Sequence, residues 1–509
     1  MDGDAFSAIA ELTQVNEQLR RENRLLQEKI HYLTHQRFSR KSEQLDGQPG
    51  LFDCAASEPA QSGAEGEIET QSPVPPKNKQ GGRRRPPAHL PRQRIEHDLA
   101  DEEKRCSCGC EGVRIREEIS EQYDVEPPRF RILEHVRYVY AWSCGCNRGV
   151  QCAPKAADPL PRSQVSAGLL AWLGSGKYVD GLPLHRQAGI LDRRFGVSFT
   201  TTTLAQWMIQ SAERMLKPLV AAMEGVVRSS DYLHMDETFF QVLDEPQRHA
   251  WQKSYLWVRM TGTGPPIILL DYHSSRAGAV ADELLAGYSG YLHIDGYSGY
   301  NGPASRAGIT VLGCWAHVRR KFDAAIKSAG KLSRQGVLAR EALEQIAQLY
   351  RIEKAARALE PEQRRQRREE KSRGVLEKLR SWLDRHLDEA AGFGGAFAKA
   401  CGYMNNQWPR LVRFIEDGRL RLDNNRVENH IRPIAMGRKN WLFSKSPEGA
   451  HASALWYSVV ETARANGWEP YHYLKWLFTE LPARLQQRLP IDDMLPWNAK
   501  PRQFGDVVN

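Results

Sequence analysis

The sequence predicts a chain of several domains built around a mixed α/β sheet. Two stretches, 232–241 and 291–299, share one strand-like pattern, in which an aromatic residue, Leu, His and an apolar residue precede Asp236 or Asp295. Further strand-like runs follow the first stretch at hairpin spacing, and a helical pattern precedes the second. The 509 residues are enough for several domains.

The order of the expected elements determines how the sheet is connected. Besides the two stretches that carry Asp236 and Asp295, the expected elements are strands at 253–260, 266–271 and 309–313, a helix at 279–285 and a basic helix from about 315. Three meandering strands, a helical crossover and a parallel strand form a mixed sheet with the two aspartates on neighbouring strands. This is the ribonuclease H-like arrangement.

Carboxylates within such strands predict a metal site. Two carboxylates repel each other, and burial raises the cost of their ionised forms. Mg²⁺ or Mn²⁺ removes both problems, and two such ions can clamp an in-line phosphoryl displacement. A third acidic candidate is Glu428, on the first turn of an expected helix. The alternatives are that each Asp only forms a turn and that Asn425 and Glu428 form a capping box.

Five segments, taken together and in this order, resemble the transposases of the insertion sequence 66 family: HMDET at 234–238, HIDGY at 293–297, CWAHVRRKF at 314–322, DNNRVE at 423–428 and IRPIAMGRKN at 431–440. The resemblance implies a DDE transposase of a bacterial insertion element, with Asp236, Asp295 and Glu428 as its catalytic triad. One departure is Asn429, where the family usually has Arg.

The implied reaction is metal-dependent cleavage of the element ends, followed by strand transfer into target DNA, with two Mg²⁺ (or Mn²⁺) ions per active site. The implied partners are double-stranded DNA (the terminal inverted repeats and the target), a second copy of the chain or a larger synaptic assembly, and small accessory proteins of the same element. The alternatives are a nuclease of the same fold that cuts without joining, and a DNA-binding regulator without catalysis. All three carboxylate positions are filled, which disfavours the regulator.

The composition favours a soluble protein with polyanionic partners. The formal charge is +9, and the isoelectric point is near 9.0. No apolar run approaches the roughly 20 residues that cross a bilayer, and the first residues lack the basic start and apolar core of a signal peptide. We therefore expect a cytoplasmic location and no membrane partner.

Residues 1–40 predict a coiled-coil helix, because Leu recurs every seven residues from Leu12 to Leu33, with Asn16 and Asn23 in companion core positions. Core Asn favours a parallel dimer, and the alternative is an amphipathic helix that packs on its own protein. Residues 41–92 read as a disordered, basic and Pro-rich linker. Its three arginines, 83–85, are expected either in a DNA minor groove or in solvent.

Residues 93–156 predict a zinc-finger-like module, as the family has in this place. Thiolates from two cysteine clusters, separated by a strand-like stretch at 129–142, can supply the four ligands of a structural zinc. The favoured ligands are Cys106, Cys144, Cys146 and either Cys108 or Cys110. His97 and Cys152 are reserve ligands, and unligated cysteines are the alternative.

Residues 157–228 read as a helical, DNA-binding domain with helices at 165–172, 184–195 and 200–223. The turn after 195 contains Gly, and the next helix opens with four threonines, which suits a helix-turn-helix. Arg186, Arg193 and Arg194 are expected near phosphates. The alternative is an ordinary helical region that braces the sheet.

Residues 229–450 are expected to form the catalytic domain, with an antiparallel helical hairpin inserted at about 323–402, and 451–509 a C-terminal helical segment with an aromatic core. The basic run 364–368 is either the solvated tip of the hairpin or a DNA contact. Pro433 is expected to bend or end the helix of Glu428. Trp441 would offer a stacking surface, and the predicted DNA contacts are His317, Arg319, Arg320, Arg432, Arg438 and Lys439.

Overall fold

A computed structural model describes residues 16, 19, 20, 23, 94, 129–141 and 150–500. The expected coiled coil and linker lie outside these residues, apart from isolated positions, and so do Cys106, Cys108, Cys110, Cys144 and Cys146. The chain divides into two compact units. The described part of the larger unit is 16, 19, 20, 23 and 154–500, and that of the smaller unit is 94, 129–141 and 150–153.

The described part of the smaller unit is a short hairpin. Strand β1 (Val139–Ala141) pairs antiparallel with β2 (Val150–Cys152). The strand expected at 129–142 forms only over its last residues, because β2 offers three residues as partners. Cys152 is exposed on β2.

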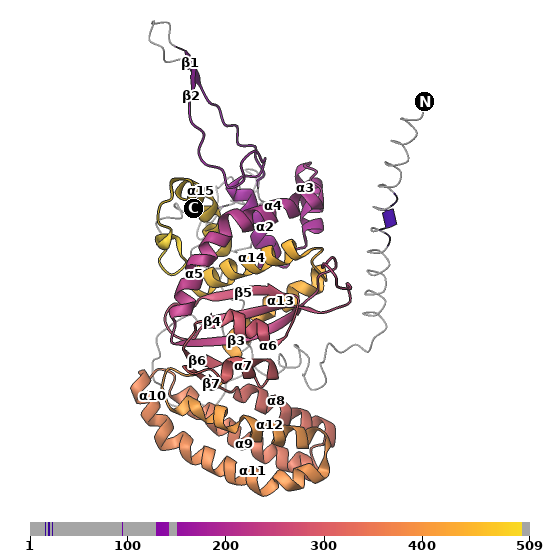
Figure 1. Cartoon of the computed structure of the whole chain (residues 1–509), viewed down its shortest axis with the longest axis vertical. Coiled ribbons are helices and arrows are strands. Elements are labelled where there is room, and N and C mark those ends of the chain that lie inside the picture. Colours follow the sequence, from indigo (N-terminus) through magenta and orange to yellow (C-terminus); the bar gives the residue numbers. More distant parts are fainter. Residues whose placement is uncertain are drawn as a thin grey trace, which may run out of the picture. The chain divides into compact units, whose positions relative to one another are not determined.

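A five-stranded mixed sheet forms the centre of the larger unit, in the order β5-β4-β3-β6-β7 (Figure 1). Its strands are β3 (Tyr232–Phe240), β4 (Ser254–Thr261), β5 (Ile268–His273), β6 (Gly290–His293) and β7 (Ile309–Leu312). The first three are antiparallel, whereas β6 and β7 run parallel to β3. Helix α6 (Gly278–Leu284) makes the crossover, and η2 (Ser298–Tyr300) and α7 (Asn301–Ala304) join β6 to β7. The predicted mixed sheet is present, and the strand that carries Asp236 and the strand that precedes Asp295 are neighbours, as expected.

Strand β3 carries two chemically different faces. Alternation along a strand places His234, Asp236 and Thr238 on one face and Glu237 on the other. The first face meets helix α13 (Asn425–Trp441), since Arg438 donates to the Thr238 hydroxyl. This face therefore carries the predicted carboxylate together with the helix of Glu428.

Helices from both ends of the larger unit share one core with the sheet. They are α2 (Ala167–Tyr178), α3 (Leu184–Phe195), α4 (Thr201–Ser211), a π-helical turn η1 (Ala212–Leu216), α5 (Lys217–Ser229), α14 (Pro447–Ala465) and α15 (Pro470–Gln487), with the 3₁₀ turn η5 (Asp492–Met494) after them. Thr200 caps α4, and Gly196 ends α3 in the left-handed conformation with φ 65°. The helix–turn–helix sequence of elements is thus present, while Leu204 and Met208 of α4 are buried in this core.

Helix α14 covers the edge strand β5. The Leu270 amide donates to the Ser458 hydroxyl at 2.8 Å, and the Ile268 amide donates to the Thr462 hydroxyl at 3.0 Å. An edge strand otherwise exposes such amides, so α14 satisfies backbone groups that no neighbouring strand can reach. The C-terminal aromatic residues are core, as predicted, since Trp456 and Tyr473 have no exposed surface.

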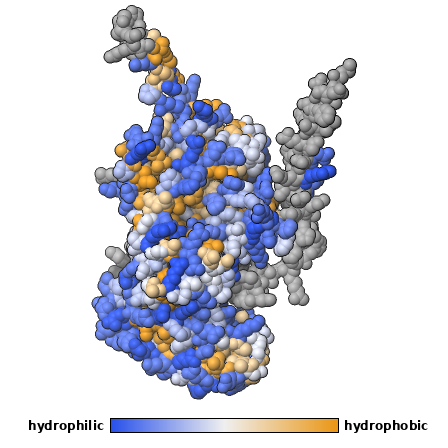
Figure 2. Space-filling model, in the orientation of Figure 1, coloured by the Kyte–Doolittle hydropathy of each residue, from blue (hydrophilic) through white to orange (hydrophobic). Residues whose placement is uncertain are grey.

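A second core lies within a helical insertion between β7 and α13 (Figure 1). Its helices are α8 (Trp315–Ala329), α9 (Arg334–Ala355), α10 (Pro361–Arg367), the π-helical turn η3 (Arg368–Ser372), α11 (Arg373–Phe393), α12 (Gly395–Leu411) and the 3₁₀ turn η4 (Val412–Ile415). The expected insertion is present, but it contains more helices than the two of a hairpin. Helix α12 also belongs to it and packs against both α8 and α11. Figure 2 shows that hydrophilic residues dominate the visible face of this insertion.

The arginines of the basic run at 364–368 differ in their surroundings. Arg368 has no exposed surface, and it pairs with Glu353 at 2.7 Å while donating to the carbonyls of Phe414, Asp417 and Leu420. Both expected roles are therefore wrong for Arg368, whose charge is needed inside the insertion. Arg365 is exposed and pairs with Glu362.

Pro433 does not end its helix. Helix α13 continues through Pro433 to Trp441. Proline removes one backbone hydrogen bond, but Ile431 and Ile434 are buried on either side of it, so packing on the sheet outweighs that loss. Among the described residues, no helix is long and apolar enough to cross a membrane.

Candidate active site

The three predicted carboxylates come from three separate segments of the chain. Asp236 lies within β3, Asp295 follows the end of β6, and Glu428 lies on the first turn of α13. Burial raises the pKa of Asp236 well above its ordinary value, and the charges of Glu237, Asp295 and Glu428 raise it further. The carboxylates therefore interact within one site.

Each aspartate also accepts a backbone hydrogen bond. Asp295 Oδ1 accepts from the Tyr297 amide, and Asp236 Oδ1 accepts from the Glu237 amide, both at 2.8 Å. The turn-forming alternative is thus correct for one oxygen of Asp295, without removing that residue from the site. Burial raises the pKa of Asp295, and the Tyr297 amide and the cations Arg276, Arg320 and Lys321 oppose this rise.

Glu428 is not part of a capping box. The N-cap of α13 is Asn424, and no side chain caps the helix there. Glu428 Oε1 instead accepts from Arg320 Nη2 at 2.5 Å, and the Glu428 side chain is 20% exposed. The capping alternative is therefore wrong, and the carboxylate points to the site.

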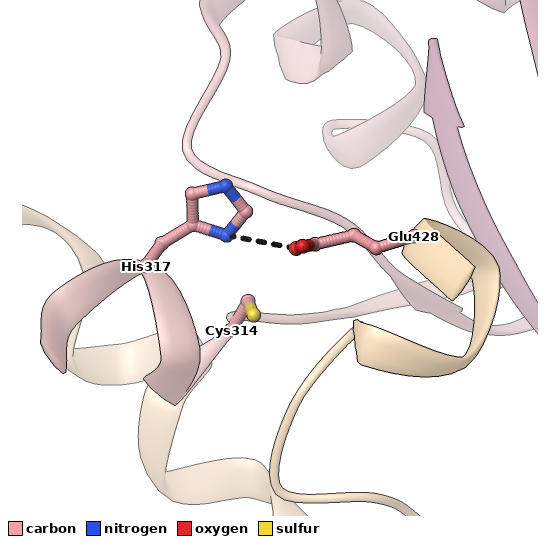
Figure 3. A group of neighbouring side chains, drawn as sticks. All are labelled: Cys314, His317 and Glu428. Atoms are coloured by element: carbon pink, nitrogen blue, oxygen red, sulfur yellow. Dashed lines mark ion pairs between the residues drawn. The ribbon is translucent and has the colours of Figure 1, made fainter. Parts of the chain in front are cut away.

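Two side chains of the loop and helix that follow β7 lie beside Glu428 (Figure 3). His317 Nδ1 is 3.8 Å from Glu428 Oε1, and the ligand atoms of Cys314, His317 and Glu428 lie within 4.8 Å of one another. This donor set suits a borderline soft cation, but Arg320 already occupies an oxygen of Glu428. Burial, Arg320 and Lys321 lower the pKa of His317 to about 3. His317 is therefore neutral near pH 7 and offers hydrogen bonds rather than positive charge.

Glu237 is a site residue that the sequence did not reveal. Its side chain is 1% exposed, pairs with Arg276 at 2.5 Å and accepts from the Tyr300 hydroxyl. Burial raises the pKa of Glu237, and Asp295 raises it further. The signal was a second acidic residue in an apolar strand, but alternation places it on the opposite face from Asp236.

The predicted DNA contacts have different surroundings. His317 and Arg320 lie at Glu428. Arg319 is exposed and lies over the ring of Tyr350 at 5.6 Å. Arg438 lies over the ring of Phe239 at 5.2 Å and donates to the Phe239 carbonyl, so it anchors α13 to β3.

The remaining candidates lie on α13. Arg432, Lys439 and the divergent Asn429 are exposed. Trp441 is partly buried, packs against Gly437 and has the Lys177 ammonium 5.3 Å from its ring centroid. Part of the Trp441 ring therefore already packs against the protein, and stacking of a DNA base on it stays a prediction.

Four family models match the chain. The model "Transposase IS66 family" matches residues 162–452, and "IS66 C-terminal element" matches 458–497. The model "zinc-finger binding domain of transposase IS66" matches 103–146, which supports structural zinc in that segment. The model "Transposase C of IS166 homeodomain" matches 25–95, which supports DNA binding.

Uncharacterized proteins of Sinorhizobium fredii (strain NBRC 101917 / NGR234) are similar over most of their length. The protein y4qI is 33% identical over 435 residues, which cover 82% of this chain and 77% of y4qI. The protein y4jD is 30% identical over 436 residues, which cover 83% of each chain. A third, y4hP, is 29% identical over 426 residues, or 79% of this chain and 75% of y4hP. With a transposase model matching more than half of its residues and these relatives alongside, the chain belongs to the IS66 family of transposases.

Proposed function

We propose that this transposase cleaves DNA at the ends of an insertion element and joins them to target DNA, with Asp236, Asp295 and Glu428 as a DDE triad. One observation carries the proposal: the parallel pairing of β3 with β6, with His234 opposite His293, brings Asp236 and Asp295 to one edge of the sheet, and a hydrogen bond from His234 to Asn424 holds the start of the Glu428 helix there. The strand order β5-β4-β3-β6-β7 supports a ribonuclease H-like arrangement of that site.

The three carboxylates of the proposed triad fit hard divalent cations. Carboxylate oxygens are the ligands that Mg²⁺ and Mn²⁺ prefer, and burial raises the pKa of both Asp236 and Asp295, so a bound cation would stabilise their ionised forms. The triad would hold two ions, which when bound would activate water or a 3′-hydroxyl and stabilise the leaving oxygen.

Neighbouring residues would position the DNA. Arg320 forms an ion pair with Glu428, and the same guanidinium could donate hydrogen bonds to a phosphate of the DNA. Arg432 and Lys439 present charge on the exposed side of α13. The turn between α3 and α4 would bring Arg193 and Arg194, both exposed, to the DNA backbone.

The proposed assembly contains two DNA ends and therefore more than one copy of the chain. The heptad leucines from Leu12 to Leu33 would supply a parallel dimer, and Cys106, Cys144, Cys146 and one of Cys108 and Cys110 would hold the structural zinc. Accessory proteins of the same element are further proposed partners, acting with the transposase in a bacterial cytoplasm.

The test uses full-length protein with a supercoiled plasmid that carries candidate element ends, with Mg²⁺ or Mn²⁺. We expect nicked and joined products from the wild type and their loss in Asp295→Asn, which should still bind the ends. Asp282→Asn is a matched control, because Asp282 is a partly exposed aspartate of α6 that pairs with Arg306 away from the site. Nicking without joining would replace strand transfer by a nuclease activity, and equal inactivity of wild type and Asp295→Asn would leave only DNA binding.

A further inference from the structure

A pair of buried histidines lies directly behind the carboxylates. His234 and His293 each stand two residues before an aspartate of the site and have no exposed surface. Their rings stack at 5.1 Å between centroids, with 20° between their planes. The two matching sequence patterns therefore meet in space, at a place that the proposed chemistry does not use.

The hydrogen bonds of His293 determine which of its nitrogens carries the proton. Nε2 lies 3.1 Å from the Gly313 carbonyl, which can only accept, so Nε2 carries the hydrogen. Nδ1 must then accept from the Tyr232 hydroxyl at 2.9 Å. The same hydroxyl accepts from the Arg421 amide at 3.1 Å. His293 thus ties the end of β6 to the loop after β7 and to the segment that precedes α13.

The same reasoning determines the tautomer of His234. Asn424 Nδ2 donates to the Met235 carbonyl at 3.0 Å, so Asn424 Oδ1 is an acceptor. His234 Nδ1 is 2.7 Å from that oxygen and must donate to it. The backbone amide of Asn424 also donates to Cys314 Sγ at 3.2 Å. His234 thus ties β3 to the N-cap of the helix that carries Glu428.

This arrangement leaves one nitrogen without a bond. Among the described residues, His234 Nε2 is a buried atom with no hydrogen-bond partner. A buried polar atom without a hydrogen bond destabilises the folded state. Leu or Met would fill a buried position without this cost, so the histidine is explained by what its Nδ1 holds in place.

We propose that His234 and His293 are positioning residues that set the spacing of the three carboxylates. Each histidine is joined by backbone to one aspartate and by a hydrogen bond to a segment next to another part of the site. The inference rests on the proposed function, because the spacing matters for binding divalent cations. Metal ligands must be held to within roughly 0.5 Å, and loss of an outer-shell partner typically costs about 10–100-fold in affinity or activity.

The test compares two amide substitutions in full-length protein. In His234→Asn, the side-chain amide nitrogen takes the place of Nδ1 and can still donate to Asn424, whereas in His234→Gln it takes the place of Nε2 and cannot. Titration with Mn²⁺, followed by electron paramagnetic resonance, measures binding without DNA or turnover. We expect His234→Gln to weaken Mn²⁺ binding by about 10-fold or more, and His234→Asn to restore it to within about 3-fold of wild type.

Controls separate this proposal from the proposed function and from unfolding. His451→Gln removes an exposed histidine whose ring packs edge-on against Tyr272 of β5, and this variant should bind Mn²⁺ like wild type. Wild-type affinity in His234→Gln, with weak binding in Asp295→Asn, would overturn the positioning role alone. Equal affinity in wild type and Asp295→Asn would overturn the metal site and this proposal with it. If His234→Gln does not fold, His293→Gln, which keeps the donor to Gly313 but loses the acceptor for Tyr232, must show the same loss.

Discussion

At Asp236, burial and three neighbouring carboxylates all act on one side chain. Each raises the pKa of Asp236, and none of the nearby cations is among the main causes that oppose the rise. A carboxylate in this position is costly to ionise, so the site is a local source of instability. This cost is expected where a cation is to be bound.

Asp236→Asn is therefore expected to stabilise the metal-free protein at pH 7 and raise its melting temperature by at least about 1 °C. A carboxyl with a raised folded-state pKa contributes stability below its unfolded pKa, near 4, and loses this contribution as the pH rises through the folded value. The difference between variant and wild type should thus vanish near pH 4. Scanning calorimetry at several pH values measures it.

Mn²⁺ reverses the comparison, because it should raise the melting temperature of the wild type and not that of Asp236→Asn. Asp282→Asn, at the partly exposed ion pair with Arg306, serves as the control and should show neither effect. A lower melting temperature of Asp236→Asn at pH 7 without metal would contradict the prediction.

The helical insertion is an element with its own core and one buried charge. Arg368 joins α9, through Glu353, to the chain that returns toward α13, through three carbonyls. That returning chain also holds Asp423, which accepts from the Tyr350 hydroxyl of α9 at 2.9 Å. The insertion thus supports the start of α13, where Glu428 lies.

Arg368→Met should destabilise the protein by about 3–5 kcal/mol, because it leaves Glu353 without its buried partner and three carbonyls without a donor. Arg365→Met is the matched control three residues earlier, and the loss of its exposed pair with Glu362 should leave the unfolding midpoint close to that of wild type. Urea unfolding of both variants measures the difference. Similar unfolding midpoints for the two would show that the buried pair adds nothing.

At the scale of the molecule, the helices before and after the sheet belong to its core. Trp456 of α14 donates to the Met208 carbonyl of α4 at 3.0 Å, and both contribute to the core that contains the sheet. The hydrophobic core therefore continues across the expected domain boundaries at 228 and 450.

Removal of the residues after Ser446 should prevent folding of the sheet. It deletes α14 and α15, exposes one face of the core and leaves the amides of Ile268 and Leu270 without the hydroxyls of α14. Truncation after Lys500 is the control, because it keeps every described element. We expect the shorter chain to be insoluble or to lack a near-ultraviolet circular dichroism signal, whereas a native signal from it would show that 451–509 is a separate unit.

Local patterns predicted the elements well. The helix at 184–195 agrees with the structure in both bounds, and the sheet order follows from the short connections between strands. The short connections also explain why Asp236 and Asp295 lie at neighbouring strands, because a helical crossover returns the chain parallel to the first strand. Patterns of period 2 and 3.6 need no knowledge of distant residues.

The sequence by itself thus determined the strands of the sheet, most of the helices around it and the three acidic candidates. Only the tertiary structure decided the partners of individual side chains: Arg320 on Glu428, Arg276 on Glu237, Arg368 inside the insertion, and the stacked pair of His234 and His293. It also decided that α13 passes through Pro433. The physical reason is range, because periodicity depends on residues a few positions apart, whereas burial and hydrogen-bond partners depend on segments that meet only when the whole chain is folded.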